Sequence, residues 1–189
     1  MTSNEAFQQN LAFGQVAESR IARWIRGRGQ AVLPVYDIEY ETGKGPRLFL
    51  GVDTKLVAPD LAVFARGRVI WVEVKHKTAF SWGYTRRRWE TGIDLHHYED
   101  YLRVMDETEL PVWLLFLHPQ SKPSADDQRH NCPPECPVGL FGGSLEYLLE
   151  NESHRHANHG PSGMVYWREE TFHRPGGETL FVPIEDVPE

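Results

Sequence analysis

The sequence predicts an α/β protein with a mixed central β-sheet flanked by helices and a loop-rich C-terminal extension. Over residues 1–118, segments with the helical spacing of apolar residues alternate with short apolar segments, in the order helix, three strands, helix, strand. After His118 the sequence becomes rich in Pro, Ser, Asp and Gln, which is typical of long loops. We therefore expect one folded core over 1–118 and an extension over 119–189 that packs on it.

The composition is that of an ordinary globular chain. Of the 189 residues, 40% are hydrophobic and 25% are charged, which excludes a disordered chain. No apolar run approaches the roughly 18 residues needed to cross a bilayer, so no membrane partner is expected. The opening residues, MTSNEAFQQN, lack the basic start and apolar stretch of a signal peptide, which favours a cytoplasmic location. With only two cysteines, a disulfide framework is excluded.

The first helix is expected from Ser3 to about Gly27, because apolar residues recur there at three- and four-residue steps. Glycines at its end favour a stop. Extended apolar segments with turn-forming residues between them follow. The expected strand segments are 31–39, 48–52 with 56–65, and 69–75, and Pro59 permits a bend.

A second helix is expected from about Asp94 to Glu107, because apolar residues form one stripe along it. The wholly apolar segment 112–117 after it indicates a strand buried on both faces. The segment 76–90 before the helix is expected to be irregular. Beyond the core, the expected elements are a long loop at 118–137, a short helix at 144–150, and late strands at 164–168 and 180–184.

Acidic and basic side chains interrupt two neighbouring apolar strands. Asp60 opens one strand, and Glu73 and Lys75 share one face of the next because side chains alternate along a strand. A two-residue loop at Arg66-Gly67 sets Asp60 opposite Glu73, and a loop at Gly67-Arg68 sets it opposite Lys75. Either register brings the three polar groups to one face, whereas a three-residue loop without a bulge would not.

Two carboxylates at short distance repel each other, and desolvation adds several kcal/mol per ion. A divalent cation such as Mg²⁺, which prefers carboxylate oxygens, removes this cost. Lys75 adds a positive charge where a water is deprotonated and where charge develops on phosphorus. Glu18 interrupts the apolar stripe of the first helix and is expected to face inward as a third acid. The alternative for Glu18 is a salt bridge to Arg47 or Arg23.

This set of residues resembles the PD-(D/E)XK nuclease superfamily, with Glu18 on a first helix, Pro59-Asp60, and Glu73-Val74-Lys75 on the paired strand. The resemblance covers roughly residues 5–117 and implies a restriction-endonuclease-like core of αβββαβ order. It also implies a Mg²⁺- or Mn²⁺-dependent nuclease that hydrolyses phosphodiester bonds of DNA. Asp60, Glu73, the Val74 carbonyl and Glu18 would be the metal ligands, and Lys75 would position or activate the attacking water.

A basic and aromatic segment, 77–89, follows the acid-bearing strand. Its four cations and four aromatic residues are typical of a surface that follows a phosphate backbone and stacks on bases. Because the net charge is -7, binding must rely on such a local patch. The alternative is a solvated basic loop with its aromatic residues in the core. The expected nucleic-acid contacts from this segment are Lys77, Trp82, Tyr84, Arg86, Arg87 and Arg88.

His97 and Tyr101 stand four residues apart on the second helix and therefore share a face. Some branches of the nuclease superfamily carry Gln-x-x-x-Tyr there, which implies that these residues contact the substrate or orient the site. In this sequence histidine replaces the glutamine. The alternative is an ordinary, partly exposed helix face.

Cys132 and Cys136, in Cys-Pro-Pro-Glu-Cys, have the spacing of half a structural zinc site. Histidines could complete one Zn²⁺ site in a region that lacks much core. The candidates are His130, His154, His156 and His159. The alternative is two reduced cysteines in a loop.

Three functions are compatible with these patterns. The first is the metal-dependent deoxyribonuclease, with DNA as its partner. The second is a catalytically inactive nuclease-fold protein that acts as a nucleic-acid-binding or assembly module. The third is a zinc-dependent hydrolase centred on the residues rich in His and Cys beyond His118. Dependence on magnesium or manganese favours the first, and activity with zinc alone favours the third.

Overall fold

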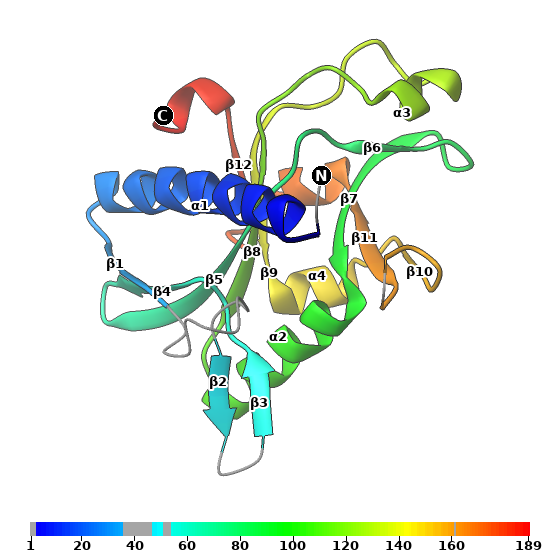
Figure 1. Ribbon diagram of the computed structural model, residues 1–189. Coiled ribbons are helices and arrows are strands. Elements are labelled where there is room, and N and C mark those ends of the chain that lie inside the picture. Colours follow the sequence, from blue (N-terminus) through cyan, green and yellow to red (C-terminus); the bar gives the residue numbers. More distant parts are fainter. Residues whose placement is uncertain (1–2, 36–46, 51–53, 161) are drawn as a thin grey trace.

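The computed structural model of the protein describes residues 3–35, 47–50, 54–160 and 162–189 (Figure 1). Parts of the expected strands 31–39 and 48–52, and the turn expected at 42–46, lie outside the described residues. Within the part that is described, no helix is long and apolar enough to cross a membrane.

A six-stranded mixed sheet forms the centre of the fold. Its strand order is β1-β4-β5-β8-β9-β12, with β5 and β8 parallel and every other neighbouring pair antiparallel. The strands are β1 (Ala31–Pro34), β4 (Leu61–Ala65), β5 (Arg68–His76), β8 (Val112–His118), β9 (Gly139–Ser144) and β12 (Thr179–Val182). Together with helices α1 (Ser3–Gly27) and α2 (Leu95–Thr108), the sheet has the order α1-β1-β4-β5-α2-β8. This confirms the predicted fold class and its αβββαβ core.

A smaller antiparallel sheet, β10-β11-β7-β6, stands beside the central one, and β2 and β3 form a separate hairpin (Figure 1). These strands are β2 (Arg47–Leu50), β3 (Thr54–Val57), β6 (Ser81–Gly83), β7 (Arg88–Asp94), β10 (His154–His156) and β11 (Met164–Arg168). The remaining elements are α3 (Ala125–Arg129), α4 (Leu145–Glu150), and the short 3₁₀ helices η2 (Glu169–His173) and η3 (Ile184–Asp186).

Several element predictions were wrong. The segment 76–90, expected to be irregular, contains β6 and the start of β7. The expected strand 56–65 is divided at residues 58–60 into β3 and β4. Beyond residue 118 the loop expected at 118–137 contains α3, and β9 and β10 were not predicted. Two strands of the central sheet, β9 and β12, come from this region. The division of the chain at residue 118 stays a prediction.

Helices cover both faces of the central sheet (Figure 1). On one face, α1 packs its buried residues against Val72 and Val74 of β5. On the other face, α2 and α4 pack with the smaller sheet around Leu114 and Phe116 of β8. Because neighbouring side chains of a strand point to opposite faces, Glu73 and Lys75 point to the side of α2.

The hairpin between β4 and β5 sets the position of the polar residues. Its two-residue loop is Arg66-Gly67, with φ values of 47° and 81°. Two successive positive φ values are typical of a type I′ turn, whose twist matches that of the flanking strands. Ala65 pairs with Arg68, and Leu61 pairs with Val72 at the far end of the ladder. The first of the two registers predicted from the sequence is therefore confirmed.

Gly92 allows β7 to pair closely with β11 within the smaller sheet. A Cβ at this position would lie 2.3 Å from the carbonyl oxygen of Val165, which is backbone and cannot rotate away. We expect Gly92→Ala to lower the free energy of unfolding by about 2–3 kcal/mol. Urea denaturation measures this, with Gly27→Ala as the control because nothing lies within 4 Å of a Cβ there. Equal stability of the two variants would contradict the packing described.

Candidate active site

Asp60, Glu73 and Lys75 lie together where β4 and β5 separate. The ladder ends at Leu61, and the Asp60 carboxylate instead accepts a hydrogen bond from the backbone N–H of Val74, with Oδ2 at 2.9 Å. This contact holds Asp60 against the β5 segment that carries Glu73 and Lys75. Lys75 Nζ lies 2.5 Å from Glu73 Oε1. The structure therefore brings the three residues into one polar cluster.

The cluster is largely shielded from water. The Glu73 side chain is 3% exposed and the Lys75 side chain 23% exposed. Glu73 Oε1 pairs with the ammonium group of Lys75. The other carboxylate oxygen, Glu73 Oε2, is buried without a hydrogen-bond partner within the described residues. A buried carboxylate oxygen without a partner is costly, so this atom fits a role as a ligand for a cation.

The charges of the cluster act on one another. Burial and the nearby charge of Glu73 raise the pKa of Asp60 well above its usual range. Burial also acts to lower the pKa of Lys75, but the carboxylates of Glu73 and Asp60 outweigh it, so the pKa of Lys75 is raised. Lys75 is therefore a protonated cation at neutral pH.

Glu18 approaches the same cluster from α1. Burial raises the pKa of Glu18, the charge of Glu73 raises it further, and the charge of Lys75 opposes both. Arg23, which the alternative interpretation paired with Glu18, donates from Nε to the Ser19 carbonyl at 3.3 Å. The structure thus places a third acid within the electrostatic reach of Glu73.

His97 and Tyr101 face the cluster from α2. Tyr101 is 1% exposed, and burial followed by the charge of Glu73 raises its pKa. Lys75 Nζ lies 6.0 Å from the Tyr101 ring centroid, and the His97 and Tyr101 rings are 6.2 Å apart. Burial and the charge of Lys75 lower the pKa of His97 to about 4, so its imidazole is neutral at pH 7. Tyr101 lies below the protein surface, whereas His97 is half-buried.

Asp94 is a member of the cluster that sequence reasoning missed. It ends β7, directly before α2, and its negative charge acts to raise the pKa of Lys75, Lys77 and His97. Burial and the charge of Lys75 nevertheless lower the pKa of Lys77 to about 8. Because β7 was not predicted, no signal placed Asp94 beside β5. The sequence placed Asp94 only at the start of the second helix.

The residues of the cluster fit a hard divalent cation by their chemistry. Asp60, Glu73 and Glu18 supply carboxylate oxygens, and two of these groups have pKa values raised by burial and by the charge of Glu73. Their arrangement is not that of a closed metal site, since the described residues contain no group of three His, Cys, Asp or Glu side chains that could hold a metal ion. One of the Glu73 oxygens, Oε1, forms an ion pair with the ammonium group of Lys75.

The structure does not bring the expected zinc ligands together. Cys136 is buried and its thiol donates to the Gln120 carbonyl at 3.2 Å, while Cys132 is half-buried, and both thiols are free. The His156 and His159 rings stack on each other with centroids 3.6 Å apart. His130 stacks on Tyr84 instead.

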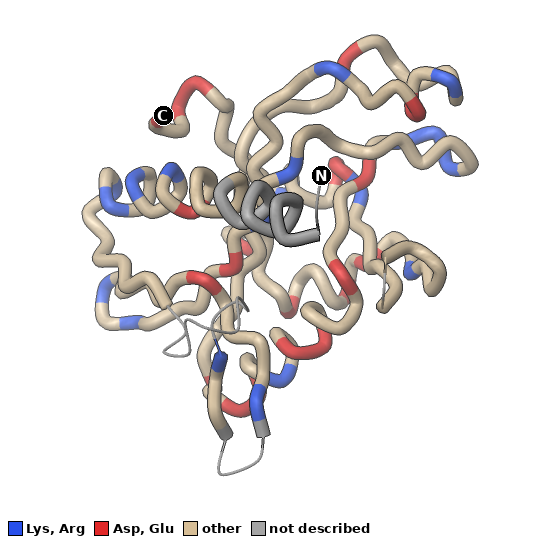
Figure 2. Tube along the Cα trace, in the orientation of Figure 1, with Lys and Arg blue, Asp and Glu red and all other residues tan. Residues whose placement is uncertain are grey.

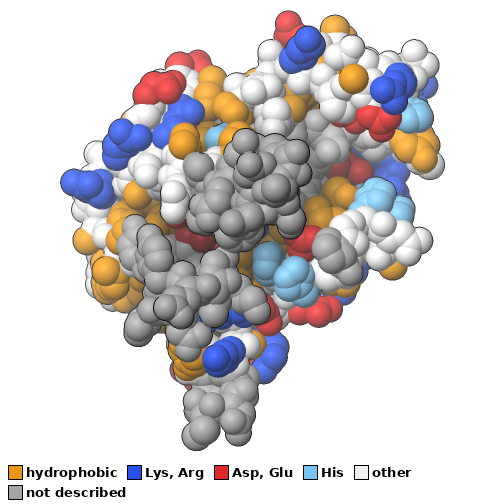
Figure 3. Space-filling view, in the orientation of Figure 1, with side chains coloured by type: hydrophobic (Ala, Val, Ile, Leu, Met, Phe, Trp, Pro, Cys, Tyr) orange, Lys and Arg blue, Asp and Glu red, His pale blue; other side chains and the backbone are white. Residues whose placement is uncertain are grey.

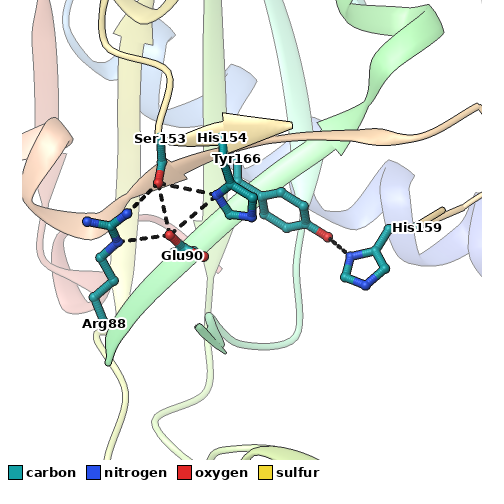
Figure 4. A network of polar contacts seen from close by, with 6 residues as sticks. All are labelled: Arg88, Glu90, Ser153, His154, His159 and Tyr166. Atoms are coloured by element: carbon teal, nitrogen blue, oxygen red, sulfur yellow. Dashed lines mark hydrogen bonds and ion pairs between the residues drawn. The ribbon is translucent and has the colours of Figure 1, made fainter. Parts of the chain in front are cut away.

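His154 belongs to a polar network around the buried carboxylate of Glu90 (Figure 4). Arg88 Nε donates to Glu90 Oε1 at 3.0 Å, and Arg88 Nη2 donates to Ser153 Oγ at 2.9 Å. Ser153 Oγ in turn donates to Glu90 Oε1 at 2.9 Å, and His154 stacks on Tyr166. Arg88, expected to contact nucleic acid, therefore ties the smaller sheet together with a side chain only 20% exposed.

The rest of the basic and aromatic segment is divided between core and surface. Phe80 is buried, Lys77 and Trp82 are half-buried, and Trp82 packs edge-on against Trp89. Tyr84, Arg86 and Arg87 are exposed at the turn between β6 and β7. Of the contacts predicted from 77–89, these three are the ones that the structure leaves on an open surface.

The raised pKa of Asp60 gives a pH-dependent prediction for the metal-free protein. Between its ordinary pKa of about 3.9 and the raised value, the folded state binds more protons at Asp60 than the unfolded state. The stability from this group is therefore fully present below the ordinary pKa and is lost as the pH rises through the raised pKa. Asp60→Asn removes the charge and keeps an oxygen for the Val74 N–H.

We therefore expect Asp60→Asn to be more stable than the wild type at neutral pH in EDTA, with the difference vanishing toward pH 4. Melting temperatures of both proteins from about pH 3.5 to 8 measure this. Asp106→Asn, at an exposed position of α2, is the control and should change little. If the melting temperatures of Asp60→Asn and the wild type changed with pH in the same way, the Asp60 carboxylate would not have a raised pKa in the folded protein.

No protein-family model matches the chain, and no curated protein sequence matches it. Among solved structures, the protein is similar to a Holliday junction resolvase from the archaeal hyperthermophile Archaeoglobus fulgidus. The two chains are 9% identical, and the match covers 84% of this chain and 90% of the resolvase, with a TM-score of 0.46. The function proposed below rests on the chain's own residues.

Proposed function

We propose that the protein is a Mg²⁺- or Mn²⁺-dependent nuclease that hydrolyses phosphodiester bonds of DNA. The observation that carries the proposal is the cluster of Asp60, Glu73 and Lys75, in which Glu73 is buried and its Oε2 has no hydrogen-bond partner among the described residues. A fold gains nothing in stability from a buried carboxylate beside a second one that repels it, so a role in binding and chemistry explains the pair better. The resemblance of Asp60 and Glu73-Val74-Lys75 to the PD-(D/E)XK pattern supports the same function.

Asp60, Glu73, Glu18 and the Val74 carbonyl are the groups that would hold the divalent ion. When bound, the ion would supply a water of lowered pKa and positive charge beside the scissile phosphate. The side chains would orient the ion and the substrate. Asp60 is held by the Val74 N–H, so its second oxygen is the one available as a ligand.

Lys75 acts as a fixed positive charge. Because its pKa is raised, it holds its proton on Nζ and does not serve as a general base. Its N–H groups can orient the attacking water and stabilise the negative charge that develops on the phosphate oxygens. The buried Tyr101 ring beside Lys75 helps to exclude water from this side of the cluster, which strengthens these interactions.

DNA is the proposed substrate because the cluster resembles nuclease sites and because exposed cations stand at the β6–β7 turn. Arg86 and Arg87 are exposed at the β6–β7 turn, within a chain whose net charge is -7. In Figure 2, Lys and Arg mark this turn at one end of the molecule, and the neighbouring α3 segment carries both acidic and basic residues. Such a local basic surface can hold a phosphate backbone that the rest of the surface repels.

The test is cleavage of linear, circular, single-stranded and branched DNA with Mg²⁺, Mn²⁺, Zn²⁺ or EDTA. The proposal expects cleavage with Mg²⁺ or Mn²⁺ and none with EDTA. Cleavage with Zn²⁺ alone would favour a hydrolase centred on the histidines beyond residue 118. Binding of DNA without cleavage under any condition would favour the inactive binding module and would contradict the enzyme. A cytoplasmic location stays a prediction from the sequence.

A further inference from the structure

A groove of about 540 Å³ lies beside the β6–β7 hairpin, between this hairpin, the chain around α3 and the β10–β11 hairpin. We call it the aromatic groove. Its polar and aromatic lining includes Trp82, Tyr84, Lys122, His130, His159 and Tyr166. Its volume lies within the usual range for ligand sites, about 300–1,000 Å³. In Figure 3, hydrophobic and histidine side chains gather on this side of the molecule.

The walls of the groove are fixed to each other by Asp127. Its Oδ1 accepts the backbone N–H of Trp82 at 2.8 Å, which joins the α3 segment to β6. Its Oδ2 accepts the Ser124 hydroxyl at 2.6 Å. Asp126, the other acid of the lining, pairs with Arg129 at 3.1 Å. Because both carboxylates already have partners in the protein, their repulsion of an anionic ligand is reduced.

Tyr84 and His130 form a flat platform at the groove. Their rings stack with centroids 4.5 Å apart and planes 18° apart. The Tyr84 side chain is nevertheless among the most exposed aromatic groups, with the residue 61% exposed. Trp82 and Tyr166 are half-buried and also line the groove, and His154 covers one face of the Tyr166 ring. Ring faces that remain accessible in a polar groove are the surface on which nucleobases stack.

The groove adjoins the acidic cluster. Thr78, which lines the groove, lies two residues beyond the end of β5, the strand that carries Glu73 and Lys75. The carboxylate of Asp94 acts on Tyr166, in the lining, and also on Lys75 and Lys77 in the cluster. On the outer side, Arg86 and Arg87 stand at the turn that follows Tyr84. A strand lying in the groove would therefore have cations on its outer side and the cluster at its inner end.

We propose that the aromatic groove binds unpaired bases of a single-stranded DNA segment and leads that strand to the acidic cluster. Paired bases are already stacked inside a duplex and cannot offer their faces to Tyr84, Trp82 or Tyr166, whereas unpaired bases can. The inference rests on the proposed nuclease function and narrows its substrate. The substrate would contain a single-stranded end, gap or branch.

The experiment measures binding of fluorescent oligonucleotides to the full-length protein in EDTA, where no cleavage occurs. A single strand should bind more tightly than the duplex of the same sequence and than a single strand with abasic sites. Tyr84→Ala should weaken binding of the single strand about tenfold, which is the loss of one stacked base, and should leave duplex binding nearly unchanged. Tyr84→Phe should retain the affinity, because the ring face remains.

Phe49→Ala is the matched control, because Phe49 is also exposed but lies on the β2–β3 hairpin, far from α3 in Figure 1. It should bind single strands like the wild type. Folding of Tyr84→Ala is checked by its melting temperature, which should be unchanged at so exposed a position. Quenching of 2-aminopurine in the bound strand should decrease in Tyr84→Ala, which reports the stacking directly.

Equal binding of intact and abasic strands, or wild-type affinity in Tyr84→Ala, would overturn the inference. These outcomes are separable from failure of the nuclease function, which is measured by metal-dependent cleavage in parallel. Cleavage that requires Lys75, together with wild-type binding by Tyr84→Ala, would support the nuclease function and contradict the role of the groove. Loss of single-strand binding in Tyr84→Ala, without any cleavage by the wild type, would support the role of the groove and contradict the nuclease function.

Discussion

Replacing Lys75 with alanine is expected to reduce the rate of DNA cleavage by about 10²–10³-fold, as the loss of one preorganised donor does in other sites. The ammonium group lies 2.5 Å from Glu73 Oε1, and the acids around it hold its proton. Its removal takes away the charge that stabilises the attacking water and the phosphate oxygens. Asp60 and Glu73 remain, so affinity for the divalent ion should hold or rise because a competing cation has gone.

Single-turnover cleavage at saturating metal measures the loss, and calorimetry measures the metal affinity separately. Lys55→Ala, which removes an exposed lysine of β3, is the control and should cleave at the wild-type rate. The melting temperature of Lys75→Ala should stay near that of the wild type when Mg²⁺ is present. Cleavage at the wild-type rate by Lys75→Ala would show that the mechanism assigned to the cluster is wrong.

Replacing Glu73 with glutamine is expected to have the larger effect, about 10³-fold or more, because both metal binding and turnover are lost. Ion-assisted charge stabilisation is worth several kcal/mol, and each 1.4 kcal/mol corresponds to a factor of ten. Glu73 is the buried member of the cluster, and its Oε2 has no other partner among the described residues. A neutral amide there cannot replace the charge that holds the ion.

The loss of metal can be followed without measuring activity. A ligand at 100 times its Kd stabilises a folded protein by about 2.7 kcal/mol, so Mg²⁺ should raise the melting temperature of the wild type. Glu73→Gln should show no such increase. Glu90→Gln is the control, because Glu90 is equally buried but its carboxylate contacts Arg88 and Ser153. The same Mg²⁺ response in Glu73→Gln and the wild type would exclude Glu73 as a ligand.

The acidic cluster could be predicted because its determinants are local in the sequence. Alternation along one strand sets Glu73 and Lys75 on the same face, and the Arg66-Gly67 turn fixes the register that carries Asp60 to them. The close contact between the Asp60 carboxylate and the Val74 N–H was not predictable, since it depends on where the ladder ends.

The late strands predicted at 164–168 and 180–184 correspond to β11 and β12, whereas β6, β7, β9 and β10 were not predicted, because the residues of these four strands fit a strand only when their partner strands are known. Gly142 interrupts the apolar pattern of β9, yet a Cβ there would lie 2.3 Å from Leu115 Cδ2, so packing requires the glycine. Glu90 and Thr91 are polar but buried within β7. Without β7, Asp94 could not be placed beside Lys75.

The zinc hypothesis shows the limit of spacing as evidence. Two cysteines at a suitable distance predict a metal site only if histidines from elsewhere reach them. In the structure His154 is engaged with Ser153 and stacks on Tyr166, and His159 contacts the Tyr166 hydroxyl at 2.8 Å (Figure 4). These partners lie within or next to the β10–β11 hairpin, whose first strand was not predicted.

The central claim is that Asp60 and Glu73 hold the divalent ion of a nuclease. Anomalous diffraction from crystals of the protein soaked in Mn²⁺ tests it most directly, since the signal locates the ion without reference to activity. The account predicts a manganese peak within coordination distance of the Asp60 and Glu73 carboxylates, roughly 2.0–2.3 Å as for other hard cations. A peak only at the histidines and cysteines beyond residue 118, or none at these two carboxylates, would contradict it.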